Sequence, residues 1–166
     1  MFIALNGPIG IGKSTLAEAL TESIAQCAML NGDALLELNP PVADETDFLH
    51  TLLVVLIAHY QRSGYRHFVI DHFWRLPEAL SDLRSRLFQL DPSAQFRPFL
   101  LTLAQDEHKR RLERRLEARD QRDREFELRC FAEERALLTN ADVGERFDVS
   151  GPLPTLVARL RQRIGL

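Results

Sequence analysis

The first feature of the chain that could do chemistry is a glycine-rich run near its start. The run reads Gly7-Pro8-Ile9-Gly10-Ile11-Gly12-Lys13-Ser14 and is followed by Thr15. It matches G-x-x-x-x-G-K-[ST] at every fixed position and lies between a predicted strand and a predicted helix. Glycines let successive backbone N–H groups turn inward around a phosphate, and the following helix adds its positive end. Residues 7–15 are therefore predicted to form a P-loop that binds the phosphates of ATP.

Three side chains have individual expected roles around the bound nucleotide. Lys13 should span the β- and γ-phosphates, and the hydroxyl of Ser14 should bind Mg²⁺. Asp71 directly follows the apolar run Phe68-Val69-Ile70, which predicts a central strand. A carboxylate at that strand end can hold Mg²⁺ through water, although apolar strands also end in Asp for turn reasons. Because the P-loop is present, we favour the metal role for Asp71.

A separate group of polar residues points to a second substrate. Asp33 follows the second predicted strand in the sequence Asn31-Gly32-Asp33, at the sheet edge where open α/β folds bind ligands. We expect Asp33 to orient the phosphate acceptor. Glu37 and Asn39 are nearby alternatives for the same role, and an ordinary Gly-Asp turn is the structural alternative.

The elements that must position these residues alternate between strand and helix, and they predict a doubly wound α/β fold around a parallel five-stranded sheet. Residues 47–60 are apolar nearly all round, which predicts a helix buried on several sides that crosses the core. Strands are predicted at 2–5, 28–30, 68–71, 99–103 and 147–149, and helices at 16–27, 47–60, 77–90, 105–118, 125–138 and after Pro152.

The segment Asp71-His72-Phe73-Trp74-Arg75 has the spacing of the Asp-Gly-Phe-Pro-Arg motif of adenylate kinases. With the P-loop and the layout of elements, the chain resembles nucleoside-monophosphate-kinase-like P-loop kinases, which include shikimate kinases and chloramphenicol-phosphotransferase-like proteins. The resemblance implies a P-loop NTPase fold with a short helical lid, and an acceptor phosphate or hydroxyl bound near Arg75 and Asp33. His72 and Trp74 replace the family's Gly and Pro. Trp74 either lines the acceptor pocket or is a core aromatic residue.

The expected lid lies at about 115–128, where arginines crowd the chain. The resemblance implies that Arg119 and Arg122 close over the migrating phosphoryl group and neutralise its charge. Like-charged neighbours such as Arg115 and Arg119 repel on a helix, so a purely structural helix face explains this cluster poorly. Acidic residues alternate with basic ones from 109 to 129, which favours a salt-bridged helix over a nucleic-acid surface.

The length, charge and cysteine content of the chain limit its domain number, its location and its possible metal or redox sites. A length of 166 residues and a net charge of −3 fit one domain spanning 1–166, present as a monomer or homodimer. Cys27 and Cys130 match no redox or zinc spacing and are expected to be buried thiols. The start of the chain lacks a signal-peptide or membrane-span pattern, so a cytoplasmic protein is expected. His50 and His59 are expected to lie in the core or in a pocket wall.

Together these features predict an ATP- and Mg²⁺-dependent phosphotransferase that acts on a hydroxyl or phosphate group of a small molecule. The sequence has no N-K-x-D or L-S-G-G-Q motif, and it offers little room for an additional AAA-type helical domain. The alternative is an ATP-binding switch or regulatory protein that phosphorylates nothing. A switch would not need Asp33 beside an acceptor cavity, and this distinguishes the two functions.

Overall fold

A computed structural model of the chain describes residues 1–117, 121–139 and 141–166, with the backbone alone for residues 122 and 123. Its centre is a five-stranded sheet in the order β2-β3-β1-β4-β5, with every neighbouring pair parallel. This confirms the predicted fold class. The strands are β1 (Phe2–Asn6), β2 (Cys27–Asn31), β3 (His67–Asp71), β4 (Phe96–Thr102) and β5 (Glu145–Asp148).

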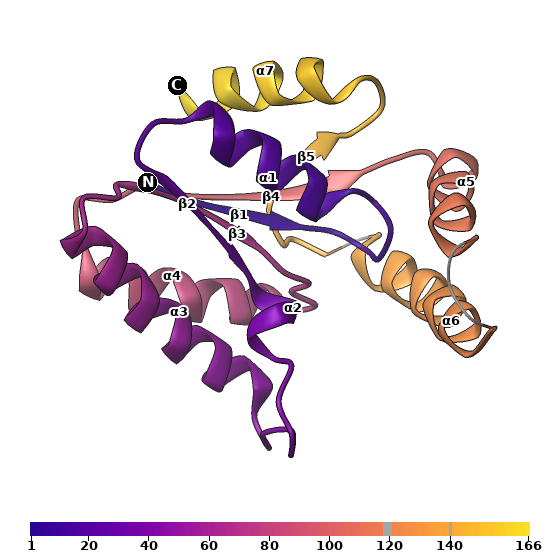
Figure 1. The fold of residues 1–166 in the computed structure, drawn as a ribbon, viewed down its shortest axis with the longest axis horizontal. Coiled ribbons are helices and arrows are strands. Elements are labelled where there is room, and N and C mark those ends of the chain that lie inside the picture. Colours follow the sequence, from indigo (N-terminus) through magenta and orange to yellow (C-terminus); the bar gives the residue numbers. More distant parts are fainter. Residues whose placement is uncertain (118–120, 140) are drawn as a thin grey trace.

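Helices cover both faces of the sheet (Figure 1). One face carries α1 (Lys13–Ser23) and α7 (Leu153–Ile164), and the other carries α3 (Glu45–Arg62) and α4 (Pro77–Leu90). Alternate side chains of β1 serve the two layers, because successive residues of a strand point to opposite faces. Ile3 packs in the cluster that includes Leu16 and Leu160, whereas Phe2 packs in the one that includes Leu53 and Leu83.

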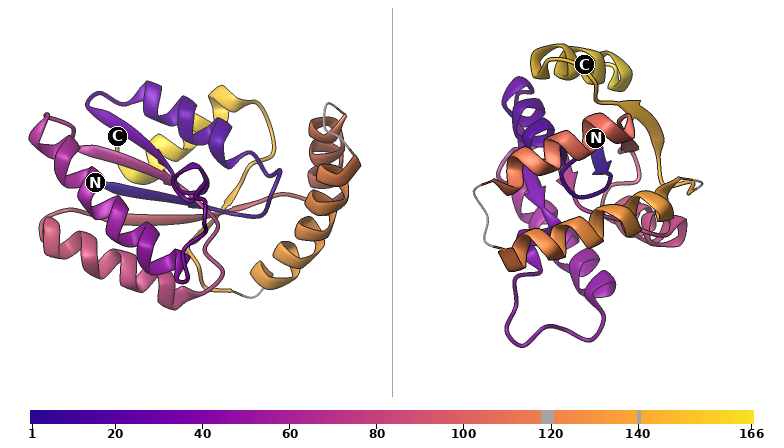
Figure 2. Two further views of the ribbon diagram at one scale, coloured as in Figure 1. Left: turned by 60° about the horizontal axis from the view of Figure 1, so that its bottom comes forward. Right: turned by 90° about the vertical axis from the view of Figure 1, so that its right-hand side faces the viewer.

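The carboxyl ends of all five strands lie at one edge of the sheet, and the remaining elements gather there. They are the P-loop, the short helix α2 (Gly32–Leu35), and a hairpin of α5 (Gln105–Leu116) and α6 (Gln121–Leu138). Figure 2 shows this hairpin standing across the end of the sheet. Ligands of open α/β folds bind at this edge, so the fold brings the candidate residues to the expected place.

Two local features differ from what the sequence suggested. The Gly-Asp turn, the structural alternative at residues 31–33, is replaced by a short helix: Asn31 accepts a hydrogen bond from the Ala34 N–H at 2.8 Å and caps α2. Strand β4 begins at Phe96 rather than at residue 99. Pro98 is tolerated because β5 pairs with β4 only from Phe99 onward.

The prediction for residues 47–60 was right about the helix and wrong about its burial. Helix α3 lies on one face of the sheet beside α4 and does not cross the core. Its inward side consists of Leu49, His50, Leu53 and Ile57, whereas Val55 on the other side is 58% exposed. His59 is exposed as well, contrary to the expectation. Helix α3 therefore has more apolar residues than its one buried face needs.

The lid region and the cysteines also differ in detail from the predictions. Helix α5 ends at Leu116, and Ala118 lies outside the described residues. The basic residues of α5 form the predicted ion pairs along the helix, including Lys109 with Glu113 and Arg110 with Glu107. Cys27 and Cys130 are both free and only partly buried, so the expectation of buried thiols was wrong.

Candidate active site

The P-loop connects β1 to α1, and its lysine folds back over the loop. Lys13 Nζ donates a hydrogen bond to the Gly7 carbonyl oxygen at 2.8 Å. Burial lowers the pKa of Lys13, an effect that the negative charges of Asp71, Asp33 and Glu134 oppose. The ammonium group therefore lies among three carboxylates, at the place where a triphosphate would be bound in a P-loop.

Gly10 shows why the loop needs glycine for reasons of both backbone and space. Its φ is +74°, a backbone conformation that residues other than glycine rarely adopt. A Cβ atom at this position would also lie 2.9 Å from the Leu112 Cδ1 atom of α5. The loop is consequently packed directly against the first helix of the hairpin.

Both backbone polar groups of Ile9 in the P-loop contact side chains of the α5–α6 hairpin. Its N–H donates to Glu134 Oε2 at 2.6 Å, and its carbonyl oxygen lies 2.8 Å from His108 Nε2. Arg135 can only donate, so its 3.0 Å contact makes His108 Nδ1 the acceptor and Nε2–H the donor to Ile9. His108 is fully buried, and burial lowers its pKa from 6.5 to about 4.

These contacts were not predicted from the sequence, since 125 residues separate Glu134 from Ile9. Burial raises the pKa of Glu134, while the Ile9 N–H and Lys13 act in the opposite direction. A carboxylate thus accepts from a backbone N–H of the phosphate-binding loop. Loop N–H groups of this kind are the donors that bind phosphate oxygens in P-loops.

The residues expected to hold Mg²⁺ fit a metal bound mainly by phosphate and water. Asp71 is buried at the end of β3; Asn31 donates to its Oδ2 at 3.1 Å, and its Oδ1 has no hydrogen-bond partner among the described residues. Burial raises the pKa of Asp71, whereas the nearby Ser14 hydroxyl and the Lys13 charge lower it. Ser14 and Thr15 are exposed in the first turn of α1. No group of three or more His, Cys, Asp or Glu side chains that could hold a metal ion together occurs in the described parts of the chain.

Asp33 forms a pair with a residue to which the sequence assigned no role. Asp33 Oδ1 lies 2.8 Å from His72 Nδ1, and this hydrogen bond is the main cause that lowers the pKa of Asp33. The two elements approach closely: a Cβ atom on Gly32 would lie 2.8 Å from the His72 ring. Glycine at position 32 therefore permits the contact between α2 and the segment after β3.

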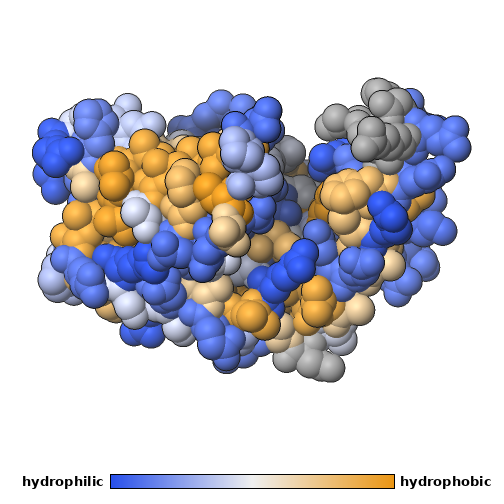
Figure 3. All heavy atoms as spheres, turned by 90° about the horizontal axis from the view of Figure 1, so that it is seen from below, coloured by the Kyte–Doolittle hydropathy of each residue, from blue (hydrophilic) through white to orange (hydrophobic). Residues whose placement is uncertain are grey.

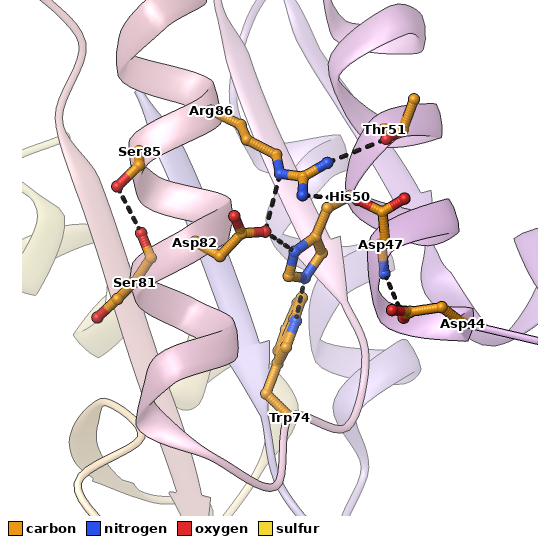
Figure 4. Close-up of polar contacts among 9 residues, drawn as sticks. All are labelled: Asp44, Asp47, His50, Thr51, Trp74, Ser81, Asp82, Ser85 and Arg86. Carbon is orange, nitrogen blue, oxygen red and sulfur yellow. Dashed lines mark hydrogen bonds and ion pairs between the residues drawn. The ribbon is translucent and has the colours of Figure 1, made fainter.

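Trp74 is fixed by hydrogen bonds at both its backbone and its ring. The buried Asn6 side chain accepts from the Trp74 N–H at 3.0 Å and from the Gly7 N–H at 2.8 Å, so it links the segment after β3 to the P-loop. The Trp74 indole donates to His50 Nε2 at 3.2 Å, and His50 Nδ1 lies 2.7 Å from Asp82 Oδ2 (Figure 4). The indole is 2% exposed, and it still forms part of a cavity wall.

Lys13, Asp33, His72 and Trp74 line one cavity of about 650 Å³. Its apolar wall includes Leu36, Leu49, Phe73, Leu76 and Phe126. Leu76 and Phe126 are 61% and 56% exposed, although both side chains are large and apolar. Figure 3 shows the surface hollowed between the main body and the α5–α6 arm. The charged side chains of the cavity wall are Lys13 and Arg75, and Asp33, Glu45 and Glu134.

The other predicted acceptor residues are placed less centrally. Arg75 is exposed at the cavity, and its guanidinium lies 5.7 Å from the centre of the Phe73 ring. Glu37 and Asn39 are exposed in the stretch that follows α2, and neither belongs to the cavity wall. Asp33, Trp74 and Arg75 are thus the predicted acceptor residues that share a cavity with the P-loop lysine.

Arg115 and Arg124, two arginines of the predicted lid at 115–128, have structural contacts in the hairpin. Arg115 Nε lies 3.4 Å from Glu127 Oε2, and Arg124 Nε donates to the Leu116 carbonyl at 2.7 Å. Both contacts connect α5 with α6, so a structural role explains part of this cluster. Arg119 lies outside the described residues, and so does the side chain of Arg122.

With this geometry established, comparison with known proteins places the chain in a family. A profile described as "AAA domain" matches residues 3–132, from β1 well into α6. The chain belongs to the AAA domain family. The match covers the P-loop, the end of β3 and most of the hairpin. A search of curated proteins finds no match.

Solved structures resemble the chain over nearly its whole length. The tunicamycin resistance protein of Deinococcus radiodurans has a TM-score of 0.62 at 21% identity, covering 99% of this chain and 95% of its own. A gluconokinase from Sinorhizobium meliloti 1021 has a TM-score of 0.64 at 17% identity, covering 98% and 94%. Shikimate kinase from Bacteroides thetaiotaomicron has a TM-score of 0.57 at 15% identity, covering 100% and 99%. These neighbours confirm the predicted P-loop kinase fold.

None of the helices in the described ranges is both long enough and apolar enough to cross a bilayer.

Proposed function

We propose that this protein transfers the γ-phosphate of ATP to a hydroxyl group of a small molecule. The observation that carries the proposal is that Lys13 of the P-loop and the Asp33–His72 pair line the same cavity. Phosphoryl transfer needs a cationic cradle for the triphosphate and a directed hydroxyl within reach of it. The fold is shared with a gluconokinase and a shikimate kinase, and phosphotransfer is the activity that we carry over from them.

The residues fit ATP with Mg²⁺. Residues 7–15 would hold the triphosphate, and Ser14 and Asp71 would hold Mg²⁺, which adds positive charge beside the β- and γ-phosphates when it is bound. Lys13 would neutralise the charge that develops during transfer, and Arg119 and Arg122 would add to it from the lid. The Asp33–His72 pair would orient the acceptor hydroxyl.

The charge of the cavity favours a hydroxyl over a phosphate acceptor. Apart from Lys13, which serves ATP, Arg75 is the one cation among the described lining residues, and three carboxylates face the same space. A second phosphate would add negative charge beside these carboxylates. The exposed apolar side chains of Leu76 and Phe126 at the cavity favour an acceptor with an apolar body, because binding would remove that surface from water.

The proposal can be tested against the switch alternative by measuring acceptor-dependent ADP release. The purified protein is incubated with ATP, Mg²⁺ and a panel of alcohols that ranges from polar sugars to ring compounds with apolar bodies. We expect ADP release to rise above the rate without acceptor for alcohols of the apolar type. A rate that no alcohol and no phosphorylated acceptor changes, with ATP bound, would favour the switch.

A further inference from the structure

We propose that His50 is a positioning residue of the acceptor site, which holds Trp74 as the wall that limits the size of the acceptor. The inference deepens the proposed function and rests on it, because it assigns the selection of the acceptor in that reaction. Its observations are the 3.2 Å hydrogen bond between the Trp74 indole and His50, and the place of Trp74 between the cavity and the core.

Trp74 belongs both to the wall of the cavity and to the hydrophobic core. Its side chain is almost completely buried, and it packs in the core cluster that includes Leu80 and Leu83. The same residue lines the cavity that contains Lys13. The indole therefore separates the cavity from the core, and the body of an acceptor cannot extend past it.

The hydrogen bond to His50 selects one orientation of the indole. The backbone of Trp74 is already fixed, because Asn6 binds both its N–H and its carbonyl oxygen. The χ2 angle of tryptophan is broad and roughly twofold, so apolar contacts alone leave more than one ring orientation open. A ring that turned away from His50 would leave the buried indole N–H without a partner, which is costly.

The same bond determines where His50 carries its proton. The indole N–H can only donate, so His50 Nε2 must be unprotonated, and the neutral ring has its proton on Nδ1. Nδ1–H then donates to Asp82 Oδ2 at 2.7 Å. His50 is fully buried, and burial is the first cause that lowers its pKa, in agreement with a neutral ring.

Asp82 is held in turn by Arg86, so the support of the indole extends across the α3–α4 pair (Figure 4). Arg86 Nε lies 2.8 Å from Asp82 Oδ2. Its two other nitrogens donate to Asp47 and Thr51 of α3 at 2.8 Å and 3.0 Å. One guanidinium thus connects the two helices around His50. A wall whose supports are themselves fixed keeps its position when an acceptor contacts it.

Packing of the core alone does not explain this chain of polar groups. An apolar side chain at position 50 would fill the space without any hydrogen-bond partner, whereas a buried imidazole loses its hydration and needs two partners. Both partners are present, and one of them is the cavity wall itself. What the polar chain adds to apolar packing is therefore a single orientation of the Trp74 ring.

A wall in one fixed position gives the cavity a defined limit for the apolar body of the acceptor. One methylene more or less in a hydrophobic pocket changes kcat/KM by roughly 10-fold to 200-fold. In a series of alcohols of increasing length, we therefore expect a sharp fall in kcat/KM where the body reaches Trp74. The wall contacts the body before and during transfer alike, so its loss should act mainly on the acceptor KM.

The first arm of the test needs neither ATP nor an acceptor. Nitrogen NMR of the ¹⁵N-histidine-labelled protein, with His50→Gln used for assignment, reports which ring nitrogen of His50 carries the proton near neutral pH. We expect the Nδ1–H form. The Nε2–H form would overturn the proposal, because Trp74 could not then donate to that nitrogen.

The indole gives a second reading in the same arm, because Trp74 is the one tryptophan of the chain. Its ring N–H signal should shift clearly in His50→Leu, which removes the acceptor of the hydrogen bond. His59 is exposed on the same helix, and His59→Leu should leave the signal in place. A signal that is unchanged in His50→Leu would overturn the proposal.

The second arm measures kcat and KM for alcohols whose apolar body grows by one methylene at a time. The wild type should show a fall of ~10-fold or more in kcat/KM between two neighbours of the series. In His50→Leu this fall should become shallower, and the KM of the alcohols that the wild type accepts should rise roughly 10-fold, with ATP affinity unchanged. His59→Leu should behave as the wild type.

Asp82→Ala keeps this arm decisive if His50→Leu does not fold. The Asp82 side chain is 43% exposed, so its removal takes away the support of His50 without changing the core. The fall in kcat/KM should become shallower here too, by less than in His50→Leu.

A wild type that accepts every length alike would overturn the proposal, and so would a fall that keeps its full size in folded His50→Leu or Asp82→Ala. Either result would leave Trp74 as a core residue without a part in selection. Failure of the proposed function would look different: no alcohol would raise ADP release by the wild type, and the selection of acceptors would fall with it. The NMR arm would still show whether His50 holds Trp74, so the two failures are distinguishable.

Discussion

The two ends of the cavity are built in different ways. The nucleotide end is a contiguous loop at residues 7–15, and its donors are mostly backbone N–H groups that the glycines turn inward. The acceptor end is assembled from α2, α3, the segment after β3 and α6, and its groups are side chains. A phosphate has the same shape in every reaction, so a local backbone motif suffices for it. An acceptor differs from enzyme to enzyme, and its site can change residue by residue on a constant fold.

One residue joins the two ends. The Asn6 side chain binds the N–H of Gly7 at the start of the P-loop, and both the N–H and the carbonyl of Trp74 on the acceptor wall. A buried amide at the end of β1 therefore fixes the start of the P-loop relative to the segment after β3. The difference between the two ends leads to tests that affect one end and leave the other intact.

Asp33→Asn is expected to give the largest difference between its effect on acceptor-dependent turnover and its effect on ATP affinity. The change preserves the shape of the side chain and removes the carboxylate that holds His72. Acceptor-dependent ADP release should fall ~10²-fold to 10⁴-fold while ATP affinity measured by calorimetry stays near the wild-type value. A rate close to that of the wild type would remove Asp33 from the mechanism. Glu37→Gln then becomes the next variant to measure, because Glu37 is an exposed carboxylate near Asp33 in the sequence, although it lies outside the cavity wall.

Lys13→Ala should affect the nucleotide end and thereby all turnover. Removing this charge from the triphosphate should weaken the binding of ATP analogues and reduce turnover by ~10²-fold to 10³-fold, the range for one electrostatic group. Calorimetry and ADP release give the two readings, and circular dichroism checks that the variant is folded. Unchanged affinity and turnover in a folded variant would show that the P-loop assignment is wrong.

Gly32→Ala tests the close approach of α2 to His72. A methyl group there would lie 2.8 Å from the ring, so it should push His72 away from its place beside Asp33. Displacements of about 1 Å cost up to ~10²-fold, so we expect acceptor-dependent turnover to fall by roughly 10-fold to 10²-fold with ATP affinity retained. An equal loss of ATP affinity would mean that the two ends are not separable at this point.

The hairpin contact with the P-loop can be tested through its pH dependence. His108 has a folded pKa of about 4, below its ordinary value of 6.5, so the unfolded chain binds the extra proton between these values. Stability should therefore fall as pH decreases through this window, and His108 should account for about 2 kcal/mol between pH 7 and pH 5. Urea unfolding at both pH values should show a smaller pH effect in His108→Gln than in the wild type. Equal pH effects in the two proteins would contradict the account of His108.

Glu134→Gln should have the smallest effect, and its sign is informative. The Glu134 carboxylate accepts from the Ile9 N–H and lies near Lys13, so it competes with and repels a bound triphosphate. Removing a like charge from such a site contributes about 1 kcal/mol, and ATP should bind roughly fivefold more tightly. Glu133→Gln on the exposed side of α6 is the matched control. Weaker ATP binding in Glu134→Gln would mean that the carboxylate supports the nucleotide instead.

The sequence predicted what depends on neighbouring residues along the chain. Short apolar runs were sufficient to predict all five strands, and the P-loop pattern was sufficient to predict the strand–loop–helix unit around Lys13. The end of β3 at Asp71 was also as predicted from the apolar run that precedes this carboxylate. These features follow from local propensity and periodicity.

Contacts between distant residues could not be predicted in this way. Nothing in the sequence near His72 indicates that Asp33, 39 residues away, will bind its ring. The burial of α3 was overestimated because Val55 is apolar and yet faces solvent, and the pattern alone does not show which side meets the sheet. One signal was available for His72: it stands where the resembling family has glycine, and such a departure beside a carboxylate-bearing strand end is a reason to suspect function.

The central claim, that one cavity brings ATP and an alcohol together, is tested most directly by following the phosphoryl group itself. ATP labelled at the γ-phosphate is incubated with the wild type and with Asp33→Asn, in the presence and absence of an alcohol that raises ADP release. We predict that the wild type moves the label onto the alcohol oxygen, and that Asp33→Asn binds ATP but leaves the label on it. Label that appears only as inorganic phosphate, at a rate that neither the alcohol nor the substitution changes, would contradict the account.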